Sequence, residues 1–169
     1  YEKEYSGGGT PQNGGDADGE QGETEGGGTD RCVGARQGHS EVVSLVMGGG
    51  AAGNQGTREA GTSAVYKGAQ NGHTKVVSLL IGAAAAVKQA TTDIGTTPLI
   101  LAAQNGHTDV APLLIGGGSA ANQATTDDGT TPLFIAAQNG HTNVMPRLLR
   151  GTASVYQAPT DEGTTPLSL

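Results

Sequence analysis

A long internal repeat is the feature that most constrains what this chain can fold into. The string Asp-Asp-Gly-Thr-Thr-Pro-Leu at 127–133 has a near copy at 93–99, so the two start positions differ by 34 residues. Gln-Asn-Gly-His recurs in the same phase at 70–73, 104–107 and 138–141, and Gly-His at 38–39. A fixed period of about 20 to 50 residues is typical of solenoids, in which small units stack on one another. The sequence therefore predicts a stack of similar layers.

The composition agrees with thin layers. The chain has 169 residues, 34% of them apolar, with one Phe, four Tyr and no Trp. A globular domain of this length would have few large side chains for its core, whereas a solenoid buries Ala, Val and Leu between neighbouring units. The 30 glycines lower the expected stability, because a Gly inside a helix costs about 0.5 to 1 kcal/mol relative to Ala.

The letters of the repeat resemble those of the ankyrin repeat family. Thr97-Pro98-Leu99 is followed by Ala102-Ala103, Gly106-His107 and Leu113-Leu114 in the order of that family, and the next period repeats the string almost whole. The resemblance implies an all-α fold, an ankyrin-like α-solenoid of stacked helix-turn-helix repeats with hairpin finger loops. It divides the chain into a weak repeat at 31–58, repeats at 59–92, 93–126 and 127–160, and the truncated start of a further repeat at 161–169.

The chain departs from the family pattern in one way in the units that have Thr-Pro-Leu and in another way in the upstream units. The His that usually follows Thr-Pro-Leu is Ile100, Phe134 and Ser168 here, so the hydrogen bond that this His offers is expected to be missing. In the upstream units Ser-Ala-Val at 63–65 and Thr-Asp-Arg at 29–31 replace Thr-Pro-Leu. We expect a weaker helix start and a weaker core anchor in those two units.

Residues 1–30 form a glycine-rich acidic segment. It holds ten glycines and eight acids against Lys3 alone, which accounts for the whole formal net charge of −7. Low hydrophobicity and high charge are typical of disorder, although the phase also allows a decayed repeat. The rest of the chain is neutral and has no basic stripe, so we expect no nucleic-acid partner. It has no apolar run long enough to span a membrane.

The clear repeats carry signals for where their helices begin and end. Thr is a good cap, and Pro98 or Pro132 then suits the first helical position. The second helices are predicted at 108–115 and 142–149, with a kink or a late start caused by Pro112 and Pro146. Glycines at 48–50, 82, 116–118 and 151 are expected to stop these helices in a left-handed cap.

The four histidines, His39, His73, His107 and His141, fall on one line of the stack and raise the hypothesis of a metal site or a general base. Adjacent repeats are separated by about 8 to 10 Å, whereas each ligand of one zinc ion lies about 2 Å from it. We therefore expect a structural role at helix starts, with no metal and no cofactor.

The paired acids at 127–128 and 161–162 are interpreted as solvated finger residues, since they lack the ligand pattern of a calcium loop. No catalytic motif accompanies them, so hydrolysis at the fingers is the disfavoured enzyme alternative.

The resemblance implies that the finger tips and the exposed face of the first helix bind a protein partner. Its site residues are Asp93, Ile94, Thr96, Gln104, Asn105, Asp127, Asp128, Thr130, Gln138, Asn139, Asp161, Glu162 and Thr164. The chain is thus expected to be a non-enzymatic interaction scaffold. Its surface is nearly periodic, because Gln-Asn and Thr-Thr-Asp recur from repeat to repeat.

The alternative hypothesis is a structural subunit that stacks head to tail into a filament with copies of itself. The sequence ends on Leu167 and Leu169 in the middle of an expected first helix, and its length is one residue short of five periods. Joining one chain's end to the next chain's start would continue the repeat with one position missing. A contact of this kind propagates as a fibre. A cut through a longer array would leave similar ends.

Overall fold

The computed structural model describes residues 30–48, 63–83, 88, 90–91, 93–155, 159 and 165–167. These residues hold four helix pairs: α1 (Asp30–Gln37) with α2 (Ser40–Gly48), α3 (Ala64–Gln70) with α4 (Thr74–Gly82), α5 (Pro98–Gln104) with α6 (Val110–Gly116), and α7 (Pro132–Gln138) with α8 (Met145–Arg150). The alternatives for the acidic segment lie outside the described residues, apart from Asp30, which begins α1.

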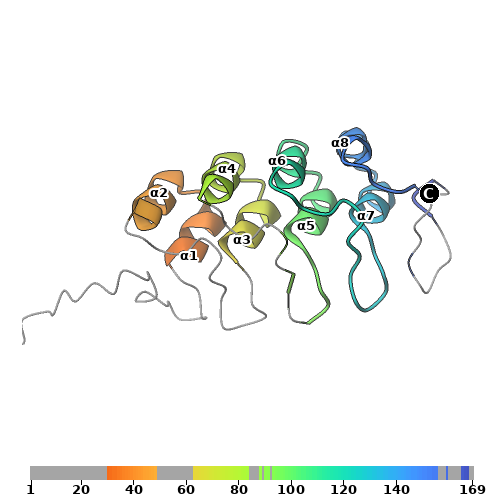
Figure 1. The fold of residues 1–169 in the computed structure, drawn as a ribbon, viewed down its shortest axis with the longest axis horizontal. Coiled ribbons are helices and arrows are strands. Elements are labelled where there is room, and N and C mark those ends of the chain that lie inside the picture. The colour runs from red at the N-terminus through yellow and green to blue at the C-terminus, as the bar shows by residue number, and fades with distance from the viewer. Residues whose placement is uncertain are drawn as a thin grey trace, which may run out of the picture.

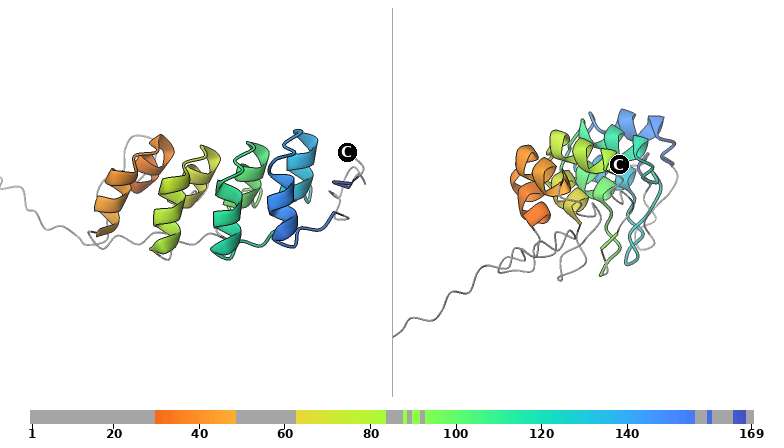
Figure 2. Two further views of the ribbon diagram at one scale, coloured as in Figure 1. Left: turned by 90° about the horizontal axis from the view of Figure 1, so that it is seen from above. Right: turned by 60° about the vertical axis from the view of Figure 1, so that its left-hand side comes forward.

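The helix pairs stand side by side in chain order and make two layers (Figure 1). α1, α3, α5 and α7 pack on one another in the first layer, and α2, α4, α6 and α8 pack in the second. Seen from above, each pair is a near copy of the one before, displaced along a single axis (Figure 2). The expected all-α solenoid is confirmed.

Side-chain caps begin the first helices. Thr97 Oγ1 accepts a hydrogen bond from the Ile100 N–H at 3.3 Å, and Pro98 follows it at the start of α5. Thr131 caps α7 in the same way. Ser63 accepts from the Tyr66 N–H at 3.3 Å, so α3 keeps its cap although Pro is absent. A weak helix start was expected for this unit, but its N-cap hydrogen bond is present.

Both helices that contain proline in the second layer begin late. α6 begins at Val110 and α8 at Met145, against expected starts at 108 and 142. Pro112 and Pro146 thereby fall in the first turn, where a missing N–H has no partner to lose. α4, which has no proline, begins at Thr74. The predicted late start is confirmed.

The core runs as a continuous strip between the layers. Leu99 and Leu133 of the first layer and Leu80, Leu114 and Leu148 of the second are fully buried. Burying one such side chain stabilises the fold by about 1.5 to 3 kcal/mol. Arg31 occupies the phase of Leu99 and is also buried, so the weak core anchor expected in the first unit is a long cationic side chain.

Of the expected left-handed glycine caps, the one after α6 is confirmed, because Gly118 has a φ of 99°, whereas the one after α8 is wrong. α5 ends in a Schellman motif, in which the Gly106 N–H bonds Ala103 O at 3.3 Å, the His107 N–H bonds Ala102 O at 2.8 Å, and Gly106 has a φ of 72°. α8 ends with the same bonds, but its left-handed residue is Thr152, with a φ of 68°, and not Gly151. The expected glycine cap is therefore wrong at α8, because the motif needs its left-handed residue one position later.

Candidate functional site

Histidine side chains tie each repeat to the one before it. Their Nε2 atoms meet backbone carbonyl oxygens of the preceding first helix: His73 meets Arg36 O at 3.0 Å, His107 meets Gln70 O at 2.9 Å, and His141 meets Gln104 O at 2.9 Å. The expected structural role is confirmed for His73, His107 and His141, but it lies between repeats. At the start of α4, His73 makes no side-chain cap.

Each of these rings lies over a glycine of the preceding repeat. A Cβ on Gly72 would lie 2.5 Å from His107 Nδ1, and a Cβ on Gly106 would lie 2.8 Å from His141 Nδ1. Contacts shorter than 3.0 Å require a shift of the neighbour. The glycine therefore serves two needs, the left-handed turn and room for the ring. No described atom lies within 4 Å of the position that a Cβ on Gly140 would take.

Asparagine amides share the same carbonyl oxygens. Asn105 Nδ2 donates to Gln70 O at 2.9 Å, so that oxygen accepts both Asn105 and His107. Asn139 donates to Gln104 O at 3.0 Å in the next layer. Asn71 departs from the pattern, because its amide donates to Lys67 O in its own helix at 3.0 Å. Two of the expected partner-binding residues therefore also hold the stack together.

The fingers around 93–96 and 125–130 are short hairpins on the side of the first helices (Figure 2). In one finger the Thr91 N–H donates to Thr96 O at 2.9 Å, and the Thr96 N–H returns to Thr91 Oγ1 at 3.0 Å. Thr125 and Thr130 pair in the same way in the next finger. The Thr126 N–H donates to Ile94 O at 2.9 Å, which joins the two fingers to each other.

One carboxylate closes the loop in each of the two described fingers. Asp128 Oδ1 accepts from Thr125 Oγ1 at 2.6 Å and from the Thr130 N–H at 2.9 Å, and these bonds hold the pKa of Asp128 below its ordinary value. The Thr91 hydroxyl, and after it the Ile94 N–H, lower the pKa of Asp93. Both side chains titrate close to solvent, so salt and water weaken these effects.

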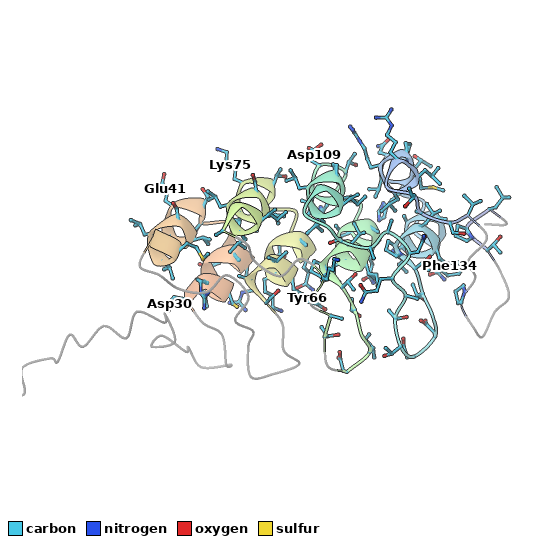
Figure 3. The ribbon with its side chains drawn as sticks, viewed as in Figure 1. Asp30, Glu41, Tyr66, Lys75, Asp109 and Phe134 are labelled. Atoms are coloured by element: carbon cyan, nitrogen blue, oxygen red, sulfur yellow. The ribbon has the colours of Figure 1, made fainter. Side chains whose placement is uncertain are left out.

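Tyr66 of α3 adds an aromatic side chain near the fingers. It occupies the phase of Ile100 and Phe134, and Figure 3 shows Tyr66 and Phe134 in the first-helix layer. Ile100 and Phe134 are buried, whereas Tyr66 is partly exposed. Burial, and after it the charge of Asp93, raises the pKa of the Tyr66 hydroxyl. Lys67 Nζ lies 5.8 Å from its ring centre, within the range of a cation–π contact.

A polar groove of about 560 Å³ crosses the ends of the first helices. It is lined by Arg36, Gln70, Asn71, Asn105 and His107. Only Asn105 was among the site residues expected from the sequence. The signal for Gln70 and Asn71 was present, since they have the phase of Gln104 and Asn105. Arg36 occupies the same position in its repeat, but the later repeats have Gln there. Comparing the repeats therefore could not single out Arg36 as a site residue.

The expected site residues fall into three groups. Asp93, Ile94, Gln104, Asn105, Asp127, Gln138 and Asn139 are exposed on the fingers and helix ends. Thr96 is buried, and Thr130 and Asp128 are partly buried inside the finger hydrogen bonds. Asp161, Glu162 and Thr164 lie outside the described residues, as does Leu169, while Leu167 is 68% exposed.

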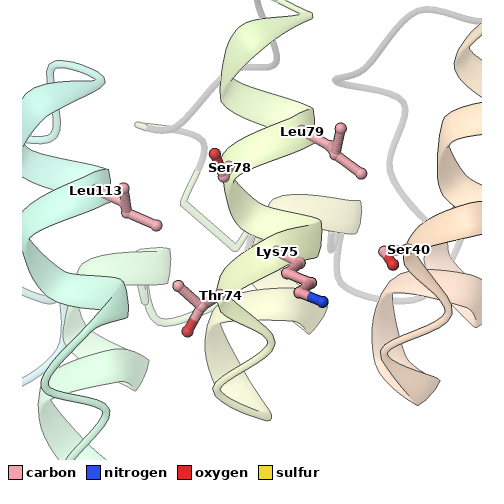
Figure 4. A pocket seen from close by; sticks show the side chains of 6 residues that line it. All are labelled: Ser40, Thr74, Lys75, Ser78, Leu79 and Leu113. Atoms are coloured by element: carbon pink, nitrogen blue, oxygen red, sulfur yellow. The ribbon is translucent and has the colours of Figure 1, made fainter.

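A second, less polar groove of about 460 Å³ lies on the opposite layer. Ser40, Thr74, Lys75, Ser78, Leu79 and Leu113 line it. In Figure 4, Lys75 and Leu79 project from α4 toward α2, and Leu113 projects from α6 toward α4. This groove could not be predicted from the sequence, because its residues share no motif.

Within the described ranges, no three His, Cys, Asp or Glu side chains come together as a metal site would require. None of the helices described is long and apolar enough to cross a membrane.

Comparison with known families gives two matches. A family model for ankyrin repeats in three copies matches residues 32–125, and a model for a single ankyrin repeat matches residues 128–160. A comparison with curated proteins finds no match.

Proposed function

The chain belongs to the ankyrin repeat family, whose repeats generally mediate protein–protein interaction, and on that premise we propose that it is a non-enzymatic scaffold that binds a protein across its fingers and first-helix ends. The observation that carries the proposal is the polar groove lined by Arg36, Gln70, Asn71, Asn105 and His107. Protein–protein interfaces have a polar rim and about ten direct hydrogen bonds, and the side chains of this groove offer donors and acceptors for such bonds.

The fingers extend the proposed binding face beyond this groove. Ile94 is 43% exposed next to Asp93, and Asp127 is exposed on the neighbouring finger. The hydrogen bond from the Thr126 N–H to Ile94 O joins the two fingers to each other. An apolar residue flanked by carboxylates suits a partner segment with an apolar anchor and basic neighbours.

A matched pair of variants tests which face binds. Once a partner has been captured and identified, the finger variant Ile94→Ser with Asp127→Lys should lose affinity at least tenfold. The variant Leu79→Ser with Lys75→Glu changes the less polar groove on the second layer and should bind as the wild type does. Circular dichroism would establish that both variants fold. If only the Leu79→Ser, Lys75→Glu variant loses binding, the partner binds the layer of the second helices instead.

As the alternative, we propose that copies of the chain stack head to tail through the ends of the solenoid. The observation that favours it is apolar surface exposed at both ends of the described stack: Leu45 of the first helix pair is 78% exposed, and Leu167, after the last helix pair, is 68% exposed. Contact between two copies would cover both residues.

Light scattering and electron microscopy test this alternative. The wild type should form rods at high concentration, and Leu167→Asp should abolish them. Leu79→Asp is the matched control, because Leu79 is 41% exposed on α4, in an inner pair of the stack. A wild type that stays monomeric at high concentration would exclude the filament.

A further inference from the structure

The polar groove at the first-helix ends has one cation and no acid among the residues that line it. Arg36, in the last turn of α1, is exposed, and Gln70 and Gln104 take its place in the next two repeats. The only acid of α1 is Asp30 in its first turn, about 9 Å away at 1.5 Å per residue. The charge of Arg36 therefore has no carboxylate of its own helix beside it.

Asn71 adds an amide that the stack does not use. Asn105 and Asn139 donate to carbonyl oxygens of the preceding repeat, whereas the Asn71 amide donates to Lys67 O of its own helix. That bond is exposed to solvent, so water can replace it at little cost. The Asn71 amide can therefore turn to a ligand in the groove without breaking a contact between repeats.

Backbone carbonyl oxygens at helix C-termini would repel an anion, but those at this groove are covered by donors. Gln70 O is bonded to Asn105 and His107, at 2.9 Å each. Arg36 O is bonded to His73 at 3.0 Å. Since a carbonyl oxygen only accepts, each imidazole presents an Nε2–H to it. The groups left to meet a ligand are therefore the guanidinium and the side-chain amides.

We propose that this groove binds a carboxylate side chain of a protein partner, with Arg36 as the main contact and Asn71 as a second donor. The inference rests on the proposed function and names the partner's chemistry at that site. The planar guanidinium presents a fork of N–H groups that fits the two oxygens of a carboxylate. One cation also balances the single charge of a carboxylate, whereas a phosphoryl group carries nearly two at neutral pH. The chemistry therefore favours an aspartate or glutamate over a phosphorylated residue.

The fingers determine what the rest of the partner segment carries. Arg36 belongs to the first helix pair, whereas Asp93 and Ile94 belong to the finger before the third. Two layers of about 8 to 10 Å separate them along the stack, and at least about six residues of extended chain span that distance. The bound segment therefore has its acidic residue at least about six positions from the apolar anchor and basic neighbours that suit the fingers.

A titration of the isotope-labelled full chain, followed by nuclear magnetic resonance, tests the assignment. The probes are three blocked tripeptides that differ only in the central residue, which is glutamate, glutamine or phosphoserine. The glutamate peptide should shift the amide signals of Arg36 and Asn71 in a saturable way. It should bind about fivefold more tightly than the glutamine peptide, the upper end for an exposed ion pair, and at least as tightly as the phosphoserine peptide. Equal binding of the first two, tighter binding of the third, or no shift at the groove would overturn the inference.

Charge-matched variants separate the groove from general electrostatics. Arg36→Gln installs the residue that the next repeats have at this place and should abolish the preference for glutamate. Lys75→Gln removes the same charge from the second-helix layer and should leave the preference unchanged. The reverse pattern would refute the assignment. Asn71→Ala should weaken binding of the glutamate peptide, and an unchanged affinity would take Asn71 out of the site. The signals of the remaining residues report whether each variant is folded.

The inference and the proposed function can fail separately. If the preference for glutamate is absent while a captured partner still depends on Ile94 and Asp127, the scaffold function stands and the groove does not bind a carboxylate. If the preference is present while the finger variant binds the partner normally, the chemistry of the groove stands and the fingers are not part of the binding face.

Discussion

Replacing two equivalent glycines by alanine would separate backbone strain from the contact with the next repeat. Gly106 and Gly140 have φ values of 72° and 71°, so an added Cβ strains both by the same amount, about 1 to 2 kcal/mol. Among the described residues, only Gly106 of these two has a ring above it, with His141 Nδ1 at 2.8 Å from the new atom. Gly140→Ala therefore measures the strain alone.

The additional cost at Gly106 follows from what the ring must give up. To clear the new methyl group, the imidazole has to move away from Gln104 O, which it contacts at 2.9 Å. One such hydrogen bond contributes about 1 kcal/mol. We expect Gly106→Ala to lower the free energy of unfolding by about 2 to 3 kcal/mol, against about 1 to 2 kcal/mol for Gly140→Ala.

Urea unfolding followed by circular dichroism would measure both costs, provided the m-value stays constant. In a His141→Ala background the ring is absent, so Gly106→Ala should cost no more than Gly140→Ala does. The explanation would be refuted if the two alanine variants cost the same in the wild type, or if removing His141 left the cost at Gly106 unchanged.

Three further outcomes are expected. Replacing Asn105 and His107 by Ala together should cost about 0.5 to 1 kcal/mol more than the sum of the single changes, because both donate to one carbonyl oxygen; the pair at 71 and 73, which uses two carbonyl oxygens, should be additive in the same urea experiment. Thr152→Gly should raise the free energy of unfolding by about 1 kcal/mol, since it relieves a left-handed β-branched residue, and a lower melting temperature would contradict this. The lowered pKa of Asp128 adds stability that is present above the unfolded pKa of about 4 and is lost as the pH falls through the folded pKa. The stability difference between wild type and Asp128→Ala should therefore shrink on acidification, and a difference independent of pH would exclude the role given to its hydrogen bonds.

The period of the repeat, together with its capping residues and prolines, is enough to predict the helix pairs. Thr97 and Pro98 place the start of α5 because a hydroxyl cap and a residue without an N–H both suit the first turn. Pro112 delays α6 for the same reason. The buried strip of leucines follows as well, since one apolar face per helix leaves few ways to stack.

Other features depend on which atoms the fold brings together. Repeat phase equates Asp127 with Asp93, yet Asp128 is the residue that closes its finger, because a carboxylate there reaches both the Thr125 hydroxyl and the Thr130 N–H. The upstream finger has Ile94 in that place, so Asp93 contacts its threonine instead. Likewise, no local pattern indicates that a histidine bonds a carbonyl in the preceding repeat, since that partner is far away in the sequence.

The joint between repeats also bears on how such a chain changes length during evolution. Each copy of Gln-Asn-Gly-His supplies the ring that contacts the preceding repeat, together with the glycine and the carbonyl oxygen that receive the ring of the following repeat. Unequal crossing-over between two copies of that string in the gene would add or remove one whole unit, and the new junction would carry the same three groups. Because stability is close to a sum over units and their nearest neighbours, a gene of this kind can lengthen or shorten without having to evolve a new interface.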